Sequence, residues 1–269
     1  MSEHIELSFA GRLLEGLGFV TVKSEALRGR ADITFFVPPQ AQGSQAVPLC
    51  ILLHGAHGSH WNWAIKGGAH RTALRLMSQH LLPPLVMAMP SDGLWGDGSG
   101  YLPHAEQDFE KWIMEDVPAA TRTVAACVSA DSPVFLCGLS MGGFGALRIG
   151  TKYPNRFRGL AAHSSITELE QMKTYIEEDP ESFGTPPDDR SVLETILRNR
   201  ATLPPIRFDC GLDDPLLEYN RRLHWELDAH GIPHRYDEFS GGHDWNYWAT
   251  HVEDSLRFFG EILSAQNQS

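Results

Sequence analysis

Gly138-Leu139-Ser140-Met141-Gly142-Gly143 is the stretch that decides the fold of this 269-residue chain. It follows the apolar residues 134–137 and precedes residues 144–148, whose composition favours a helix. A strand, a G-x-S-x-G turn and a helix together form a nucleophile elbow. Its first and last glycines are needed because a side chain there would collide with neighbouring backbone. We expect the turn to present the Ser140 hydroxyl at the end of a sheet; the alternative is a glycine-rich turn without chemistry.

A serine hydroxyl becomes a nucleophile only when a base lies within hydrogen-bonding reach and a third group orients that base. In an elbow fold both partners follow the serine, first the acid and then the histidine. Among the 13 histidines, His243 has the fitting context, because it stands in Ser240-Gly241-Gly242-His243-Asp244 after the strand-like residues 234–239. His243 is therefore the candidate base, and the alternative is a helix-capping or solvated loop histidine.

Two adjacent aspartates compete for the role of the acid. Asp213 and Asp214 follow the apolar residues 203–208 and the turn at Gly211. A carboxylate just past a strand end can accept a hydrogen bond from the imidazole and fix its tautomer. The spacing from the glycine favours Asp214, which leaves Asp213 as a loop residue or as the N-cap of a helix beginning at Pro215.

Hydrolysis of an acyl group also requires donors for the oxyanion. The first candidate is the backbone N–H of Met141, the residue after the nucleophile, and the second comes from a loop after an early core strand. Residues 48–53 are that strand, and His54-Gly55-Ala56-His57-Gly58 is the loop. The N–H of Ala56 is the candidate for the second donor.

The same loop invites a metal interpretation, because His54, His57 and His60 recur at every third position. Zinc sites, however, hold their ligands on a framework and usually add a carboxylate or a cysteine. The intervening glycines suit an anion-cradling turn better, with His54 tying the loop to its neighbours. We therefore expect no metal ligands here and no metal or organic cofactor in the reaction.

Five motifs occur in order along the chain, and together they are more specific than any one of them. They are Leu52-Leu53-His54-Gly55, Met89-Pro90-Ser91-Asp92-Gly93, residues 138–147 around Ser140, Cys210-Gly211-Leu212-Asp213-Asp214 and Gly241-Gly242-His243-Asp244-Trp245. Over roughly residues 22–259 the chain resembles the "Putative esterase" family of α/β-hydrolases. That family includes esterase D (S-formylglutathione hydrolase), tributyrin-type esterases, feruloyl esterase domains and mycolyltransferases.

The resemblance implies a serine carboxylesterase with Ser140 as nucleophile, His243 as base and Asp214 as acid. It also supports Ala56 and Met141 as oxyanion donors. The motifs are most similar to those of tributyrin and acetyl esterase-like members, so we expect hydrolysis of short-chain acyl esters of sugars or small alcohols through an acyl-enzyme. Since histidine must be neutral to act as a base, activity should fall below about pH 6.

Two other functions compete with this interpretation. An S-formylglutathione hydrolase-like thioesterase or an acyltransferase would use the same triad. However, those hydrolases usually read G-H-S-M-G-G-H-G where this chain has Leu139 and Phe144. A non-catalytic binding protein would keep the fold alone, and the intact serine, histidine and acid argue against it.

Strand-like and helical segments alternate along the chain. Such alternation predicts a single α/β domain over residues 1–269, with a mostly parallel sheet of the eight-stranded α/β-hydrolase type covered by helices on both faces. The expected strands are residues 19–23, 31–37, 48–53, 85–89, 134–137, 159–163, 205–208 and 234–239. The first two lack an intervening helix and should be antiparallel. Ligands should bind beyond the carboxyl ends of the parallel strands.

Residues 168–200 interrupt the alternation with prolines, glycine and many charges. Insertions at this place commonly form a cap over the site, and the alternative is a solvated surface excursion. Aromatic residues near the motifs should shape the substrate pocket. Trp61, beside the oxyanion loop, and Trp245, beside the base, are the candidates for substrate contact.

The remaining features concern location and partners. A net charge of −12 argues against nucleic acid or an anionic membrane as a partner, leaving a small ester substrate. Residues 1–6 do not read as a signal peptide, no apolar run could span a membrane, and three of four cysteines lie in or beside expected core strands. We therefore expect a cytoplasmic protein, with a homodimer as the commonest assembly.

Overall fold

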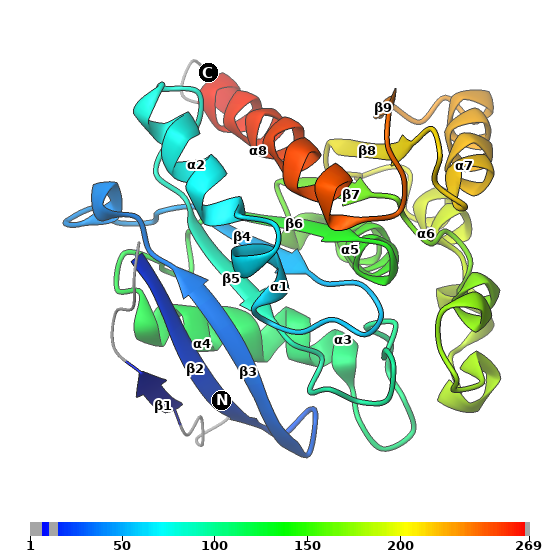
Figure 1. The fold of residues 1–269 in the computed structure, drawn as a ribbon, viewed down its shortest axis with the longest axis horizontal. Coiled ribbons are helices and arrows are strands. Elements are labelled where there is room, and N and C mark those ends of the chain that lie inside the picture. Colours follow the sequence, from blue (N-terminus) through cyan, green and yellow to red (C-terminus); the bar gives the residue numbers. More distant parts are fainter. Residues whose placement is uncertain (1–6, 11–15, 267–269) are drawn as a thin grey trace.

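A nine-stranded sheet runs through the structure, a computed structural model that describes residues 7–10 and 16–266. The strands lie side by side in the order β1-β2-β3-β5-β4-β6-β7-β8-β9 (Figure 1). Pairing is antiparallel from β1 to β5 and parallel across the rest of the sheet. The strands are β1 (Leu7–Ala10), β2 (Leu17–Ser24), β3 (Gly29–Phe36), β4 (Leu49–Leu53), β5 (Val86–Pro90), β6 (Val134–Leu139), β7 (Gly159–His163), β8 (Ile206–Gly211) and β9 (Arg235–Phe239).

The expected mostly parallel α/β sheet with an antiparallel beginning is confirmed. Strand β1, which was not among the expected strands, pairs with β2 and raises the count within the described residues from eight to nine. The central strand β4 shows why the middle of the sheet was predictable. All five of its residues are buried, with Leu49, Ile51 and Leu53 in the core on one face and Cys50 and Leu52 in the core on the other. A strand covered on both faces reads as a continuous apolar run.

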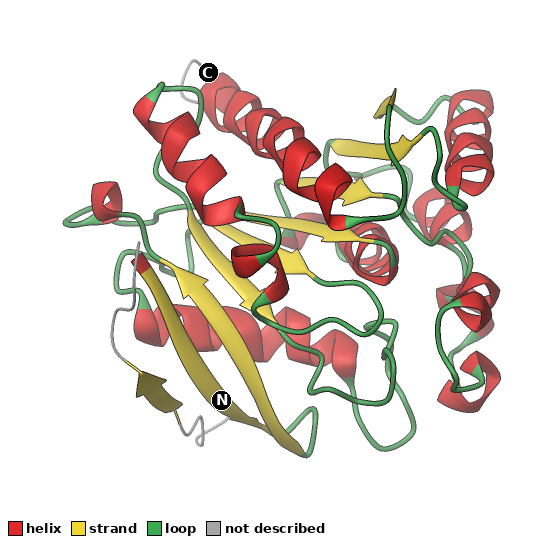
Figure 2. Ribbon diagram, in the orientation of Figure 1, coloured by secondary structure: helices red, strands yellow, loops and turns green. Residues whose placement is uncertain are grey.

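Helices cover both faces of the sheet (Figure 2). The core on one face includes side chains from α2 and α8, and the core on the other includes side chains from α4, α5, α6 and α7. The helices are α1 (Asn62–Ile65), α2 (Ala69–Ser78), α3 (Phe109–Lys111), α4 (Val117–Val124), α5 (Met141–Lys152), α6 (Val192–Arg198), α7 (Leu217–Ala229) and α8 (Trp245–Gln266).

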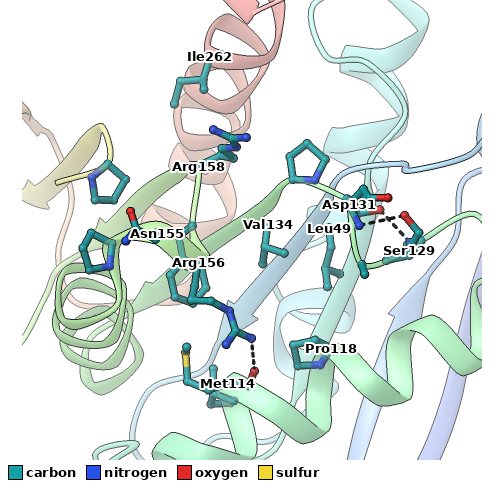
Figure 3. Close-up of a pocket in the computed structure, with 18 of the residues that line it drawn as sticks. Leu49, Met114, Pro118, Ser129, Asp131, Val134, Asn155, Arg156, Arg158 and Ile262 are labelled. Carbon is teal, nitrogen blue, oxygen red and sulfur yellow. Dashed lines mark hydrogen bonds between the residues drawn. The ribbon is translucent and has the colours of Figure 1, made fainter. Parts of the chain in front are cut away.

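The helical segment from α3 to α4 contains a wider π-helical turn over Trp112–Asp116. Pro118 explains the interruption, because it has no N–H for the carbonyl of Met114 and its ring would clash with that carbonyl. The Arg156 guanidinium donates to the Met114 oxygen instead, at 3.1 Å. Figure 3 shows this bond at the rim of a cavity of about 660 Å³. Leu49 and Val134 line the cavity, so it opens at the amino ends of the parallel strands.

Several further expectations can be compared with the structure. Helix α7 begins at Leu217 rather than at Pro215, and its first N–H groups do not bond to Asp213. Burial of Cys50, Cys137 and Cys210 is confirmed. Within the described ranges no helix is long and apolar enough to cross a membrane. The expectation about a signal peptide rests on residues 1–6, which lie outside the described residues.

Candidate active site

Ser140 stands on a tight turn between β6 and α5, as the glycine pattern predicts. Its backbone has φ 52° and ψ −119°, a conformation that residues other than glycine rarely adopt. A Cβ on Gly138 would lie 2.1 Å from the Gly142 oxygen, and a Cβ on Gly142 would lie 2.4 Å from the Leu53 oxygen. Both positions therefore require glycine, and the close packing holds Ser140 in its strained conformation.

The structure brings His243 and Asp214 to this serine. His243 Nε2 lies 3.0 Å from Ser140 Oγ, and His243 Nδ1 lies 2.9 Å from Asp214 Oδ2 and 3.1 Å from Oδ1. The three residues follow β6, β9 and β8, so they meet at the carboxyl ends of parallel strands. The Asp214 side chain is fully buried, whereas 17% of the His243 side chain remains exposed. The imidazole is therefore the exposed member of the three, since Ser140 is only 3% exposed.

Asp214 is held as a carboxylate by its surroundings. Burial alone would raise its pKa, but hydrogen bonds from His243, the Ser164 hydroxyl and the backbone N–H of Leu216 keep the pKa below its usual value. The Leu216 N–H donates to Asp214 Oδ1 at 2.8 Å. Asp213, by contrast, is exposed, and its backbone N–H donates to the Gly241 carbonyl oxygen at 2.9 Å. The geometry thus separates the two aspartates that the sequence left in competition.

The loop that carries Ala56 packs against the serine turn. A Cβ on Gly55 would lie 3.2 Å from the Ser140 Cβ, so the two backbones approach closely there. A Cβ on Gly98 would lie 2.4 Å from Met141 Sδ and 3.5 Å from the Ala56 Cα, which puts both candidate donor residues next to the same glycine. The two candidate oxyanion donor residues, one on a loop and one at the start of α5, therefore lie close to Ser140.

The three histidines of this loop have three different partners. His54 is buried, its Nδ1 donates to the Gly55 oxygen at 2.7 Å, and its Nε2 accepts from the Asp92 N–H at 3.2 Å. His57 lies 3.4 Å from an Asp97 carboxylate oxygen, and His60 bonds to the Thr34 hydroxyl at 2.8 Å. His54 therefore ties its loop to the loop after β5.

The two predicted substrate-contacting tryptophans lie near one lysine. Lys66 Nζ is 5.5 Å from the ring centre of Trp61 and 6.0 Å from that of Trp245. Within the described part of the chain, the aromatic rings in contact with His243 belong to Tyr175, stacked at 5.4 Å, and Trp248, edge-on at 5.0 Å. Sequence reasoning missed both. For Trp248 the signal was its position in the helix after the base; for Tyr175 no local signal existed.

The segment 168–200 reaches the site through Tyr175. It consists mainly of short helical turns followed by α6, and forms an outer column beside α5 and α7 (Figure 1). The Glu178 carboxylate accepts from the Asp97 N–H at 3.1 Å, and the Glu177 N–H donates to an Asp97 carboxylate oxygen at 2.9 Å. Because the Asp97 carbonyl accepts from the His57 N–H, this segment is connected to the loop that carries Ala56.

The parallel sheet, the serine elbow and helices on both faces define an α/β-hydrolase. Residues 24–259 match the family described as "Putative esterase", so the chain belongs to that family and is a serine esterase, a carboxylic ester hydrolase.

Individual relatives agree with this class. An acetyl esterase of Caldicellulosiruptor saccharolyticus is 26% identical over 238 residues, which cover 81% of this chain and 85% of that protein. A ferulic acid esterase structure superposes with a TM-score of 0.79 at 23% identity, covering 91% of this chain and 98% of that one. An S-formylglutathione hydrolase from Agrobacterium tumefaciens has a TM-score of 0.76 at 20% identity, covering 96% and 100%.

Proposed function

We propose that this esterase hydrolyses short-chain acyl esters through an acyl-enzyme formed on Ser140. The observation that carries the proposal is the unbroken path of hydrogen bonds from Asp214 through His243 to Ser140. It ends at a hydroxyl on a strained elbow where a substrate carbonyl can approach. Asp214 accepts from His243 Nδ1, so the proton-accepting nitrogen Nε2 faces the serine, which is the tautomer the reaction needs.

The reaction proceeds in two steps. Ser140 Oγ attacks the ester carbonyl while His243 Nε2 takes the hydroxyl proton, and Asp214 stabilises the resulting imidazolium. The tetrahedral intermediate collapses, the bond to the alcohol breaks, and His243 gives its proton to the departing oxygen. Water then attacks the acyl-enzyme, again losing its proton to His243, and the acid leaves as Ser140 recovers its hydrogen.

Backbone donors stabilise the tetrahedral oxyanion in this scheme. The Met141 N–H opens α5, and the Ala56 N–H belongs to the loop that packs on the serine turn. Removing one such donor typically costs about 3–4 kcal/mol of transition-state stabilisation. Both donors are backbone N–H groups, so substituting their own side chains does not remove them. A substitution at Gly98 can displace them instead, because a side chain there would collide with Met141 and press on the Ala56 backbone.

The substrate is a small molecule held between the cap and the sheet edge. Residues 168–200 act as the cap, and Tyr175 shields one face of the His243 ring. Trp61 and Trp245 form the aromatic wall for the alcohol portion, which we take to be a small alcohol or a sugar. The acetyl esterase relative supports a short acyl group.

The expected setting is the cytoplasm, without nucleic-acid or membrane partners and as a homodimer. The net charge of −12 supports the absence of polyanionic partners. All four cysteines are free thiols, which fits a reducing compartment.

Hydrolysis of p-nitrophenyl acetate by the wild type and by Ser140→Ala tests the catalytic proposal. We expect turnover by the wild type and a loss of at least about a thousandfold in the variant. An acyl series from acetate to decanoate then tests the chain-length claim, with kcat/KM falling beyond butyrate. Equal rates for both proteins would overturn the role of Ser140. A thioester preferred over every oxygen ester would replace the proposed substrate class.

A further inference from the structure

Three potential metal ligands meet at the edge of the molecule opposite the catalytic residues. His224 and Asp228 stand one turn apart on α7, and His234 immediately precedes β9. One donor atom from each residue can be chosen so that all three lie within 4.8 Å of one another. His243 follows β9 whereas His234 precedes it, so the two histidines lie at opposite ends of the same strand.

His234 is held rigidly with one nitrogen available. Its side chain is only 2% exposed and stacks on Phe208, with ring centres 5.6 Å apart. Its Nδ1 lies 2.8 Å from the Ile232 carbonyl oxygen, which can only accept, so Nδ1 carries the hydrogen. Nε2 therefore holds a lone pair. A ring N–H donated to a backbone carbonyl is the usual outer support of a metal-binding histidine.

The lone pair of His234 faces His224. His234 Nε2 lies 2.8 Å from His224 Nδ1, and the His224 ring stacks on Tyr236 at 4.8 Å. Nδ1 of His224 must supply the hydrogen in this contact, which leaves its Nε2 as a second acceptor. That nitrogen lies 3.6 Å from an Asp228 carboxylate oxygen. An ion bound here would replace the hydrogen between the two rings, so that His234 Nε2 and His224 Nδ1 both face it and the Asp228 carboxylate lies beside them.

The spacing suits a first-row transition metal. Zinc binds imidazole nitrogen and carboxylate oxygen at about 2.0–2.2 Å in tetrahedral sites, which places its ligands somewhat over 3 Å apart. His234 Nε2 lies 2.8 Å from His224 Nδ1 and 4.0 Å from an Asp228 carboxylate oxygen, and the other His224 nitrogen, Nε2, lies 3.6 Å from Asp228. The two rings therefore have to move slightly apart when an ion binds between them. Asp228 is 62% exposed, so it can swing inward, and the metal can enter from solvent.

We propose that His224, Asp228 and His234 bind one divalent ion of the zinc class, with water completing its coordination. Two imidazoles and one carboxylate favour zinc, nickel or copper over calcium and magnesium, which prefer all-oxygen sites. The ion would clamp the end of α7 to the start of β9. It has no part in ester hydrolysis, and the proposal is independent of the proposed function.

Titration calorimetry of chelator-treated protein with zinc chloride alone tests the site. The wild type should bind one equivalent, and His224→Ala should bind at least about 100-fold more weakly. His230→Ala is the matched control, because His230 is an exposed histidine at the end of the same helix whose Nδ1 lies 2.8 Å from the Glu226 carbonyl oxygen. It should bind zinc within about twofold of the wild type.

Asp228→Asn provides a second variant that leaves the packed rings untouched. We expect it to weaken zinc binding by about tenfold or more. Saturating zinc should raise the Tm of the wild type and of His230→Ala but not that of His224→Ala, since a ligand that binds only the folded state stabilises it. The absence of saturable binding at one equivalent, or equal binding by the wild type and His224→Ala, would show that the cluster is only a hydrogen-bonded histidine pair.

Discussion

Two serine–histidine–aspartate sets with matching distances lie in this molecule. The outer triad is Ser140–His243–Asp214, and the inner triad is Ser255–His163–Asp209. In each, the histidine Nε2 lies 3.0 Å from the serine Oγ, and its Nδ1 lies 2.9 Å from the nearer carboxylate oxygen. Residue types and distances therefore do not distinguish them.

Position in the fold distinguishes the two triads. All three side chains of the inner triad are buried, and Ser255 lies within α8. Arg207 contacts both Asp209 and Ser255, and Tyr247 donates to Asp209 at 2.8 Å, so every polar group is already occupied. In the outer triad, by contrast, the His243 side chain is partly exposed, and Ser140 lies on the turn at the carboxyl end of β6. An active site needs an accessible face and open oxyanion donors as well as the three residues.

Replacing the serine of each triad should give the largest difference between the two triads. Ser140→Ala should lower kcat by about 10⁶-fold while the protein stays folded. Ser255→Ala should leave kcat nearly unchanged and destabilise the fold by about 1–3 kcal/mol, because a buried acceptor on His163 loses its donor. Parallel kinetics and urea unfolding of both variants measure this contrast. Comparable kinetic losses in the two variants would mean that the inner triad takes part in the reaction.

Aspartate replacement separates the same two roles. Asp214→Asn should reduce kcat by about 10⁴-fold, since the amide no longer fixes the tautomer of His243. Asp209→Asn should instead lower the free energy of unfolding by about 3–5 kcal/mol, because the buried Arg207 loses its buried carboxylate partner and keeps only the half-exposed Asp237. Steady-state kinetics and chemical denaturation provide the two readouts. A stable, fully active Asp209→Asn protein would contradict the structural role.

Acid should inactivate the outer triad before it unfolds the inner one. We expect activity to fall below about pH 6, because a histidine base must be neutral to accept a proton, while the lowered pKa of Asp214 keeps that carboxylate ionised. Burial would raise the pKa of Asp209, but His163, Arg207 and Tyr247 hold it at about 2.

Because the folded-state pKa of Asp209 lies below the ordinary value of about 3.9, its contribution to stability is present above about pH 4. That contribution is lost as the pH falls towards 2. Circular dichroism recorded alongside the pH–rate profile separates the two events. A flat rate down to pH 4 would argue against His243 as the base.

Substitutions of Tyr175, which stacks on His243 of the outer triad, should have the smallest effect on kcat/KM. Removing a stacked ring costs about 0.5–1.5 kcal/mol, so Tyr175→Ala should lower kcat/KM by about 2- to 12-fold. Tyr175→Phe keeps the stacking and should stay near wild type. Trp225→Ala, an exposed aromatic on α7, is the control. Equal effects of all three substitutions on kcat/KM would rule out a specific role for the stacked ring.

The elbow could be predicted because its signal is local: two glycines, a serine and the flanking apolar and helical segments lie within a few residues. Spacing and the family motif already favoured Asp214 over the adjacent Asp213, and in the structure it is the Asp214 carboxylate that bonds to His243. Tyr175 could not be predicted, because only the folded path of residues 168–200 brings it to His243. Pro118 was a sequence signal for the π-helical turn. The hydrogen bond from Arg156 to the Met114 oxygen, which replaces the missing N–H of Pro118, could not be predicted because Arg156 belongs to a distant segment.

The inner triad escaped prediction for a related reason. Ser255 and His163 each read as ordinary members of a helix and a strand, and their contact depends on how α8 packs against β7. Sequence patterns report local geometry well and long-range pairing poorly. The family motifs helped with the outer triad because they already encode one such pairing.

The backbone of Ser140 has a consequence for engineering. Its φ of 52° is one that glycine adopts freely and that costs a serine about 1–3 kcal/mol. Selecting variants for heat resistance alone would therefore favour replacement of Ser140, the proposed nucleophile, by glycine and enrich stable proteins that we expect to be inactive. Any directed evolution of this enzyme needs a screen for ester cleavage in every round.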